Sequence, residues 1–132
     1  MTSTLRAEFQ ANGPANVPEF GTVKDVKGFK NLLAMDGYQQ IKEGVVYPPV
    51  MITTGLNDAR VDPWQASKLA ARLQATGTPN PVLLRIEEQG GHIDVSKSQA
   101  DELNADIAAF IFWRAGRPAW QPNLSKRSSN ER

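Results

Sequence analysis

Two residues whose types could do acid–base chemistry follow two apolar segments of this sequence. Asp58 comes shortly after the β-branched run at 50–54, and His92 follows a second apolar run at 82–87 and a Gly-Gly turn. A carboxylate and an imidazole are side chains that hold and transfer protons in catalysis. Ligands of α/β proteins bind outside the carboxyl ends of parallel strands, so an acidic residue delivered there is a common way to build a site.

Each of these residues also has a purely structural interpretation. His92 is the only histidine in the chain, and a lone histidine is usually a surface or packing residue. An Asn-Asp pair after a strand, such as Asn57-Asp58, most often forms a turn or the approach to a helix. The position of His92 after Gly90 and Gly91, at the end of the second run, favours the catalytic interpretation.

The elements that must position these residues form a strand–helix–strand unit. Residues 50–54 and 82–87 predict two short strands, and the first is apolar on both faces, as expected of a parallel strand covered by helices. Between them, Asp62 suits the N-cap and Pro63 the first position of a helix that ends near Gly77. A helix in two pieces with a break near Asp36 is expected over 22–43, and a last helix follows Ser98.

The chain is long enough for one domain at most, at 132 residues. We expect an irregular N-terminal segment at 1–21 and a partial α/β domain at 22–116. The residues from 117 to 132 are rich in Pro, Ser, Asn and Arg and predict a disordered tail. The predicted class is α/β, with a short parallel β-α-β sheet flanked by helices.

Several short motifs together resemble the C-terminal part of the catalytic domain of the prolyl oligopeptidase family, an α/β-hydrolase fold. The resemblance covers roughly residues 15–116. The matching residues are Tyr47-Pro48, Thr54-Gly55, the run from Asn57 to Pro63, Gly90-Gly91-His92 and the closing helix from Asp106 to Trp113. In that family the triad acid lies in an Asp-x-Arg-Val context and the base in a Gly-His context. The resemblance therefore implies that Asp58 is the triad acid and His92 the base.

The nucleophile of the family is missing from this sequence. The family's serine lies in a Gly-x-Ser-x-Gly elbow upstream of the acid, and no such motif occurs in these 132 residues. The chain therefore resembles a truncated hydrolase domain that carries acid and base without the serine. Other hydroxyls are present, but none follows a strand in an elbow, and Ser96 and Ser98 suit a helix start; they are Thr53, Thr54, Ser67, Ser96 and Ser98.

Other polar residues near the motif have weaker assignments. Arg60 is interpreted as a solvated or locally paired charge, while Asn57, Asp62 and Asp94 are secondary candidates for contacts near the site. One histidine, no cysteine and scattered carboxylates do not make a zinc site, and no phosphate-binding glycine loop occurs. No metal and no cofactor is expected.

Three functional hypotheses follow from these residues. The first is a serine-hydrolase-type peptidase or esterase fragment that acts on a small ester or peptide once a nucleophile is supplied. The alternative is a non-catalytic, self-associating remnant domain. A third hypothesis is an esterase that builds a shared site across subunits. In every case, two strands leave an unpaired sheet edge, which predicts a homo-oligomer formed through that edge.

Composition excludes other partners. The formal net charge of +1 gives no overall attraction to nucleic acid or to an anionic membrane. No apolar run approaches the roughly 18–20 residues of a membrane span, and the start of the chain does not look like a signal peptide. With no cysteine, the expected location is the default one, the cytoplasm.

Overall fold

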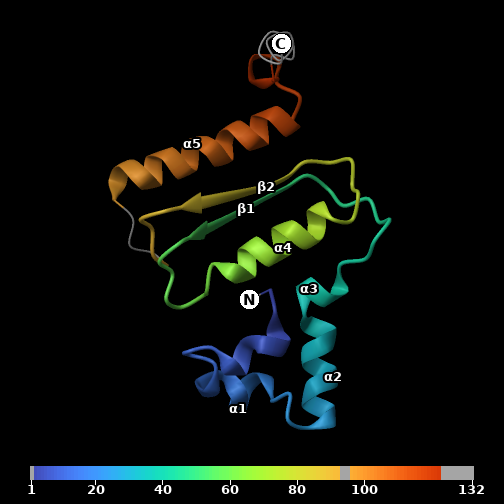
Figure 1. Ribbon diagram of the computed structural model, residues 1–132. Coiled ribbons are helices and arrows are strands. Elements are labelled where there is room, and N and C mark those ends of the chain that lie inside the picture. The colour runs from blue at the N-terminus through green and yellow to red at the C-terminus, as the bar shows by residue number, and fades with distance from the viewer. Residues whose placement is uncertain (1, 93–95, 123–132) are drawn as a thin grey trace, which may run out of the picture. The chain divides into compact units, whose positions relative to one another are not determined.

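The computed structural model of the protein describes residues 2–92 and 96–122 (Figure 1). Its internal contacts divide the chain into two compact units, Met1–Val95 and Ser96–Arg132. The sequence placed domain limits at residues 21 and 116 instead. The N-terminal segment belongs to the first unit because it packs there, and the last helix belongs to the second. Of the tail expected to be disordered, residues 123–132 lie outside the described residues.

The first unit is centred on a two-stranded parallel sheet. Strand β1 is Val50–Gly55 and strand β2 is Val82–Glu87, and they pair without offset, from Val50 opposite Val82 to Gly55 opposite Glu87. The two arrows in Figure 1 accordingly point the same way. The predicted β-α-β unit is confirmed, with both strands ending at the same level.

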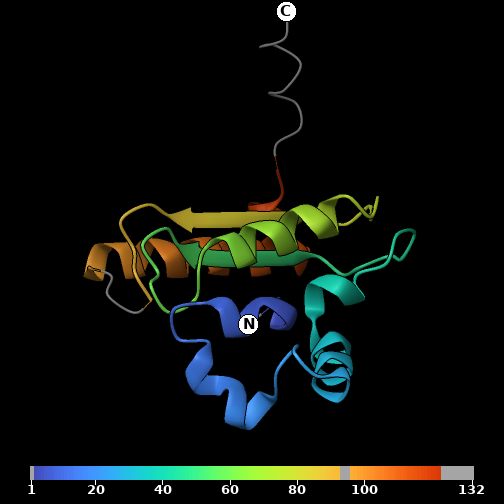
Figure 2. The same ribbon diagram turned by 60° about the horizontal axis from the view of Figure 1, so that its bottom comes forward.

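Helix α4, Trp64–Gln74, connects the strands and packs against them (Figure 2). Its Leu73 joins Ile41 and Val82 in a small apolar core, with partly buried side chains around it from Tyr47, Val50, Ile52 and Leu69. The helix begins one residue later than predicted. Pro63 occupies the N-cap position and no side chain caps the helix, so the predicted capping by Asp62 is wrong.

The N-terminal segment is helical rather than irregular, which corrects the prediction for residues 1–21. It forms the 3₁₀-helices η1, Thr4–Phe9, and η2, Pro14–Asn16, followed by helix α1, Val17–Phe20. Pro14 begins η2, because its fixed φ is suited to a first helical position. The sequence is compatible with one or two helical turns over 4–10, which η1 provides, but it indicated a stop at Pro14 and a loop over 18–21, so η2 and α1 were not predicted.

The predicted two-piece helix is present as α2, Val26–Met35, and α3, Gly37–Gln40. The break is at Asp36, as expected, and this residue is fully buried. Its carboxylate accepts hydrogen bonds from the backbone N–H groups of Gln39, at 3.1 Å, and Leu5, at 3.0 Å. One buried side chain therefore caps α3 and ties the N-terminal segment to it.

A second buried polar side chain ties the chain's start to α4. Gln65 accepts a hydrogen bond from Thr2 N–H through its side-chain oxygen, and its backbone carbonyl accepts one from the Thr2 hydroxyl, both at 3.1 Å. The start of the N-terminal segment is thus fixed to α4 by polar contacts.

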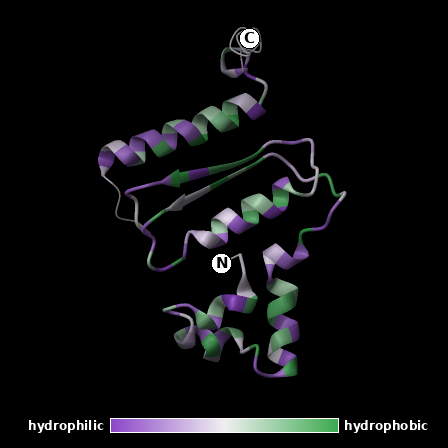
Figure 3. Cartoon of the chain, viewed as in Figure 1, coloured by the Kyte–Doolittle hydropathy of each residue, from purple (hydrophilic) through white to green (hydrophobic). Residues whose placement is uncertain are grey.

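The second unit contains helix α5, Lys97–Arg114, and the short 3₁₀-helix η3, Pro118–Trp120. A capping box at Ser96 and Gln99 begins α5, two residues before the predicted start at Ser98. Figure 3 shows hydrophobic residues gathered in the second half of α5. Among the described residues, no helix is long and apolar enough to cross a membrane.

We expect Leu73→Ala to lower the free energy of unfolding by about 2–5 kcal/mol, because Leu73 lies in the apolar core and the change leaves a cavity. Val46→Ala is the control: Val46 lies outside the helices and strands and is 69% exposed, and we expect a change within about 0.5 kcal/mol. Urea denaturation of both variants measures the difference. Equal losses would contradict the position of the core.

Candidate functional site

The two loops that leave the sheet at its carboxyl end are hydrogen-bonded to each other. Leu56 N–H donates to the carbonyl of Glu87 at 2.9 Å, and Asn57 N–H donates to the carbonyl of Gly90 at 3.0 Å. The Asn57 side-chain amide donates to the carbonyl of Glu88, also at 3.0 Å. The strand pairing is thereby continued past the last residues of β1 and β2, and the two loops are held together.

Gly55, the last residue of β1, makes this close approach possible. A Cβ placed at Gly55 would lie 2.4 Å from the carbonyl oxygen of Gly90 and 2.6 Å from that of Gly91. Both distances are far below van der Waals contact, and both atoms belong to backbone that cannot rotate away. Any larger residue would push the loop after β2 away from the loop after β1.

Asp58 is held by its own loop. Its Oδ1 accepts hydrogen bonds from the N–H groups of Arg60 and Val61, both at 2.8 Å. Such side-chain-to-backbone contacts are typical of Asp in turns. The side chain is only 10% exposed, and the second carboxylate oxygen points to the other loop.

His92 is the partner of that second oxygen. Its Nδ1 lies 2.9 Å from Asp58 Oδ2, within normal hydrogen-bond distance. An ionised carboxylate can only accept, so in the neutral ring Nδ1 carries the proton and Nε2 has the lone pair. The His92 side chain is 37% exposed, and Nε2 forms no hydrogen bond to any of the residues that the structure describes. This nitrogen is therefore available to accept a proton.

The surroundings of Asp58 keep it ionised. Burial alone would raise the pKa of Asp58, but hydrogen bonds from Val61 N–H, the His92 ring and Arg60 N–H outweigh that effect, with a smaller contribution from the charge of His92. The net pKa lies below its ordinary value. A carboxylate that stays charged at neutral pH can orient an imidazole and stabilise the imidazolium.

The secondary candidates have different surroundings. Arg60 contacts Asp58 through its backbone N–H, and its guanidinium forms no ion pair within the described part of the chain. Asn57 bonds the loop after β2, as above. Asp62 accepts from Gln65 N–H through its backbone carbonyl. Asp94 lies outside the described residues.

The hydroxyls near the motif are engaged locally or lie in the strand. Ser67 donates to the carbonyl of Pro63 within α4, at 3.1 Å. Ser96 and Ser98, at the start of α5, share a hydrogen bond of 3.0 Å. Thr53 and Thr54 are residues of β1 itself. None of the five follows a strand in a tight turn that enters a helix, the position that a nucleophile elbow requires.

Two features of the first unit were not found from the sequence. The bonds between the loops use backbone carbonyls, which carry no sequence signal.

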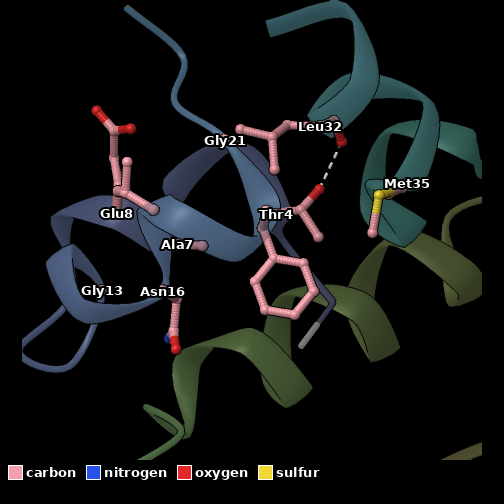
Figure 4. A pocket seen from close by; sticks show the side chains of 10 residues that line it. Thr4, Ala7, Glu8, Gly13, Asn16, Gly21, Leu32 and Met35 are labelled. Atoms are coloured by element: carbon pink, nitrogen blue, oxygen red, sulfur yellow. Dashed lines mark hydrogen bonds between the residues drawn. The ribbon is translucent and has the colours of Figure 1, made fainter. Parts of the chain in front are cut away.

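The second feature is a cavity of about 270 Å³ that lies among η1, α1 and α2 (Figure 4). Two of its lining residues are joined by a hydrogen bond, from the Thr4 hydroxyl to the carbonyl of Leu32 at 2.5 Å. Among residues 2–92 and 96–122, no group of three or more potential ligands could hold a metal ion.

The fold and the pair define a class of protein. A parallel β-α-β unit with an acid after its first strand and a histidine after its second has the chain order of acid and base in α/β-hydrolases. A solved prolyl endopeptidase, 33% identical, matches 83% of this chain with a TM-score of 0.79. Prolyl oligopeptidase B from Galerina marginata, 23% identical, matches the fold with a TM-score of 0.80 over 88% of this chain.

The sequence comparisons identify the family. The model of the prolyl oligopeptidase family matches residues 4–117. The prolyl endopeptidase of Elizabethkingia miricola is 37% identical over 74% of this chain, and prolyl oligopeptidase A of Galerina marginata is 33% identical over 85%. The chain belongs to the prolyl oligopeptidase family, as the resemblance indicated. It spans 14% and 16% of the length of these two relatives.

Replacement of Gly55 by Ala tests the loop contact. We expect a loss of about 1–3 kcal/mol in the free energy of unfolding, because the new Cβ overlaps the carbonyls of Gly90 and Gly91. Gly91→Ala is the matched control in the same region, because its Cβ would meet its nearest neighbour, Asn57 O, at an ordinary 3.9 Å. Urea denaturation measures both variants, and a Gly55→Ala variant as stable as Gly91→Ala would refute the close approach.

The pKa of Asp58 gives a second prediction. Hydrogen bonds lower this pKa, so the ionised form stabilises the fold at pH values above about 3.9, the ordinary value, and that contribution is lost as pH falls through the lowered pKa. We expect the Asp58 carboxyl carbon to titrate below about 3.9 in a ¹³C NMR experiment. Asp58→Asn identifies the signal. A midpoint above the ordinary value would mean that burial dominates.

Proposed function

We propose that this chain supplies the acid and the base of a serine-type peptidase site, and that it contributes to hydrolysis of peptide or ester bonds when a serine is supplied. The observation that carries the proposal is the 2.9 Å contact between His92 Nδ1 and Asp58 Oδ2, with Nε2 of the ring accessible. Membership of the prolyl oligopeptidase family supports the same roles for both residues.

In each half of the reaction, one proton moves twice through His92 Nε2. His92 Nε2 takes the proton from a serine hydroxyl as its oxygen attacks the carbonyl carbon of the substrate. The imidazolium then gives that proton to the leaving amine or alcohol, which departs and leaves an acyl-serine. Water, deprotonated by the same nitrogen, then attacks the acyl carbon. The bond to the serine oxygen breaks, the imidazolium returns the proton to that oxygen, and the carboxylic acid product leaves. Asp58 stays ionised throughout and holds the ring in the required tautomer.

The serine must come from polypeptide outside these residues. No Gly-x-Ser-x-Gly motif occurs in the sequence, and the chain corresponds to about 15% of its relatives' length.

Two relatives are named prolyl endopeptidase and prolyl oligopeptidase A, so we infer that the substrate is a proline-containing peptide. A cytoplasmic location is also part of this proposal, and the absence of cysteine from the sequence supports it.

A second function, a non-catalytic self-associating domain, has its own supporting observation. The sheet has two strands, and the apolar side chains of Leu83 and Ile86 on β2 are each 42% exposed. Exposed apolar residues beside an unpaired strand edge favour association with another chain. We propose that a homo-oligomer forms through this sheet edge when no further polypeptide covers it.

Complementation tests the catalytic proposal. The purified chain is mixed with a polypeptide that carries the Gly-x-Ser-x-Gly segment of a prolyl oligopeptidase family catalytic domain, and release of p-nitroaniline from a proline-containing peptide is followed. We expect activity from the mixture only. His92→Ala and Asp58→Ala should each lower it by about 10³-fold or more, because each removes a member of the triad.

Asp101→Ala is the matched control for Asp58→Ala, because Asp101 is an exposed carboxylate on α5 that pairs with Lys97 in a surface contact. We expect an unchanged rate. The mass of the chain alone in solution and its hydrolysis of a p-nitrophenyl ester separate the remaining hypotheses. An inactive oligomer that no serine segment activates would favour the remnant domain, and ester hydrolysis that His92→Ala abolishes would favour a site shared between subunits.

A further inference from the structure

Asn57 directly precedes Asp58, and its side chain points to the opposite loop rather than to the histidine. We propose that Asn57 is a positioning residue, whose amide sets the contact between Asp58 and His92 by fixing the loop after β1 to the loop after β2. The inference rests on the proposed function, because it assigns the residue that maintains the geometry of that same pair.

Asn57 bonds the opposite loop at two points. Its backbone N–H donates to the carbonyl of Gly90 and its side-chain amide to the carbonyl of Glu88, both at 3.0 Å. The turn that contains both carbonyls is closed by its own bond, from Gly90 N–H to the carbonyl of Glu87 at 3.2 Å. Two bonds from one residue therefore define both the distance and the tilt of this turn relative to β1.

The position of these bonds gives them control over the pair. Asp58 is the next residue after Asn57, and His92 is two residues after Gly90. Each partner of the pair is therefore within two residues of a hydrogen bond that Asn57 makes to the opposite loop. The pair itself is one hydrogen bond of 2.9 Å, and such a bond is lost once the atoms are more than about 3.5 Å apart. A shift of the loops by less than 1 Å, about the difference between these distances, is enough to break it.

The residue type fits this task. The bond to the Glu88 carbonyl requires a side chain that donates, as the Asn57 amide does, whereas an ionised aspartate at the same place could only accept. A hydrogen-bonding side chain in a loop could also contribute to stability alone. The two interpretations differ in one property: only a positioning residue controls which nitrogen of the His92 ring carries the proton.

The test uses the full chain labelled with ¹⁵N and needs no turnover. His92 is the only histidine, so the ring nitrogen signals belong to it without further assignment. Spectra that correlate ring nitrogens with ring protons are recorded at about pH 9, well above the ordinary imidazole pKa of about 6.5. We expect the Nδ1–H tautomer and a low-field Nδ1–H proton in the unmodified chain, and loss of both in Asn57→Ala. Asp58→Ala provides the spectrum of the broken pair.

Asn80→Ala is the matched control. The Asn80 amide also donates to a backbone carbonyl, that of Tyr47, at 2.7 Å, but at the opposite end of the two strands. We expect this variant to lose stability without a change of tautomer. Asn57→Leu has nearly the shape of asparagine without its donor, and we expect the same spectrum from it as from Asn57→Ala.

Three outcomes would overturn the proposal. The first is an unchanged tautomer in folded Asn57→Ala and Asn57→Leu, which would leave Asn57 a surface contact. The second is an equal change in Asn80→Ala, which would make the effect general. The third is unfolding of both Asn57 variants, which would make Asn57 a residue that holds the fold. Failure of complementation would refute the proposed peptidase role without affecting any of these spectra.

Discussion

The geometry of this site depends on the parallel pairing of β1 and β2 and on its continuation beyond the strands. The strands pair without offset, so both end at the same level, and the bonds from Leu56 and Asn57 carry the pairing into the loops. Gly55 removes the side chain that would hold these loops apart. Asp58 and His92, thirty-four positions apart in the sequence, meet because the backbone around them leaves little freedom for another arrangement.

The remainder of the first unit is joined by buried polar side chains as much as by apolar packing. Asp36 ties η1 to α3, and Gln65 ties Thr2 to α4. The core around Leu73 is small for the length of chain that it organises. Because a buried group that loses its partner costs more free energy than an average hydrogen bond contributes, these contacts select one arrangement of the N-terminal segment.

The sequence predicted the parts of this structure that have local signals. Apolar runs bounded by proline and glycine located both strands, and the three- and four-residue periodicity before Asp36 located α2 and its break. The turns from Pro14 onward were missed because Pro14 was interpreted as a stop and residues 18–21 as loop, although both prolines lie in the first turn of a helix. Pairing of Asp58 with His92 was expected only from the family resemblance. The bonds of Asn57 that hold the two loops together go to backbone carbonyls, which every residue has and which therefore leave no signal in the sequence.

Because the strands pair without offset, the loops at the two ends of the sheet differ in how far their lengths can change. One residue inserted between Gly55 and Asp58 would add up to about 3.3 Å of chain, more than the 2.9 Å between the carboxylate and the ring, and would change which backbone groups face Glu87 and Gly90. At the other end of the sheet, residues 75–81 lead from α4 to β2 and contribute neither member of the pair. The loops at the amino ends of the strands can therefore vary in length without disturbing the pair. The loops at the carboxyl ends cannot.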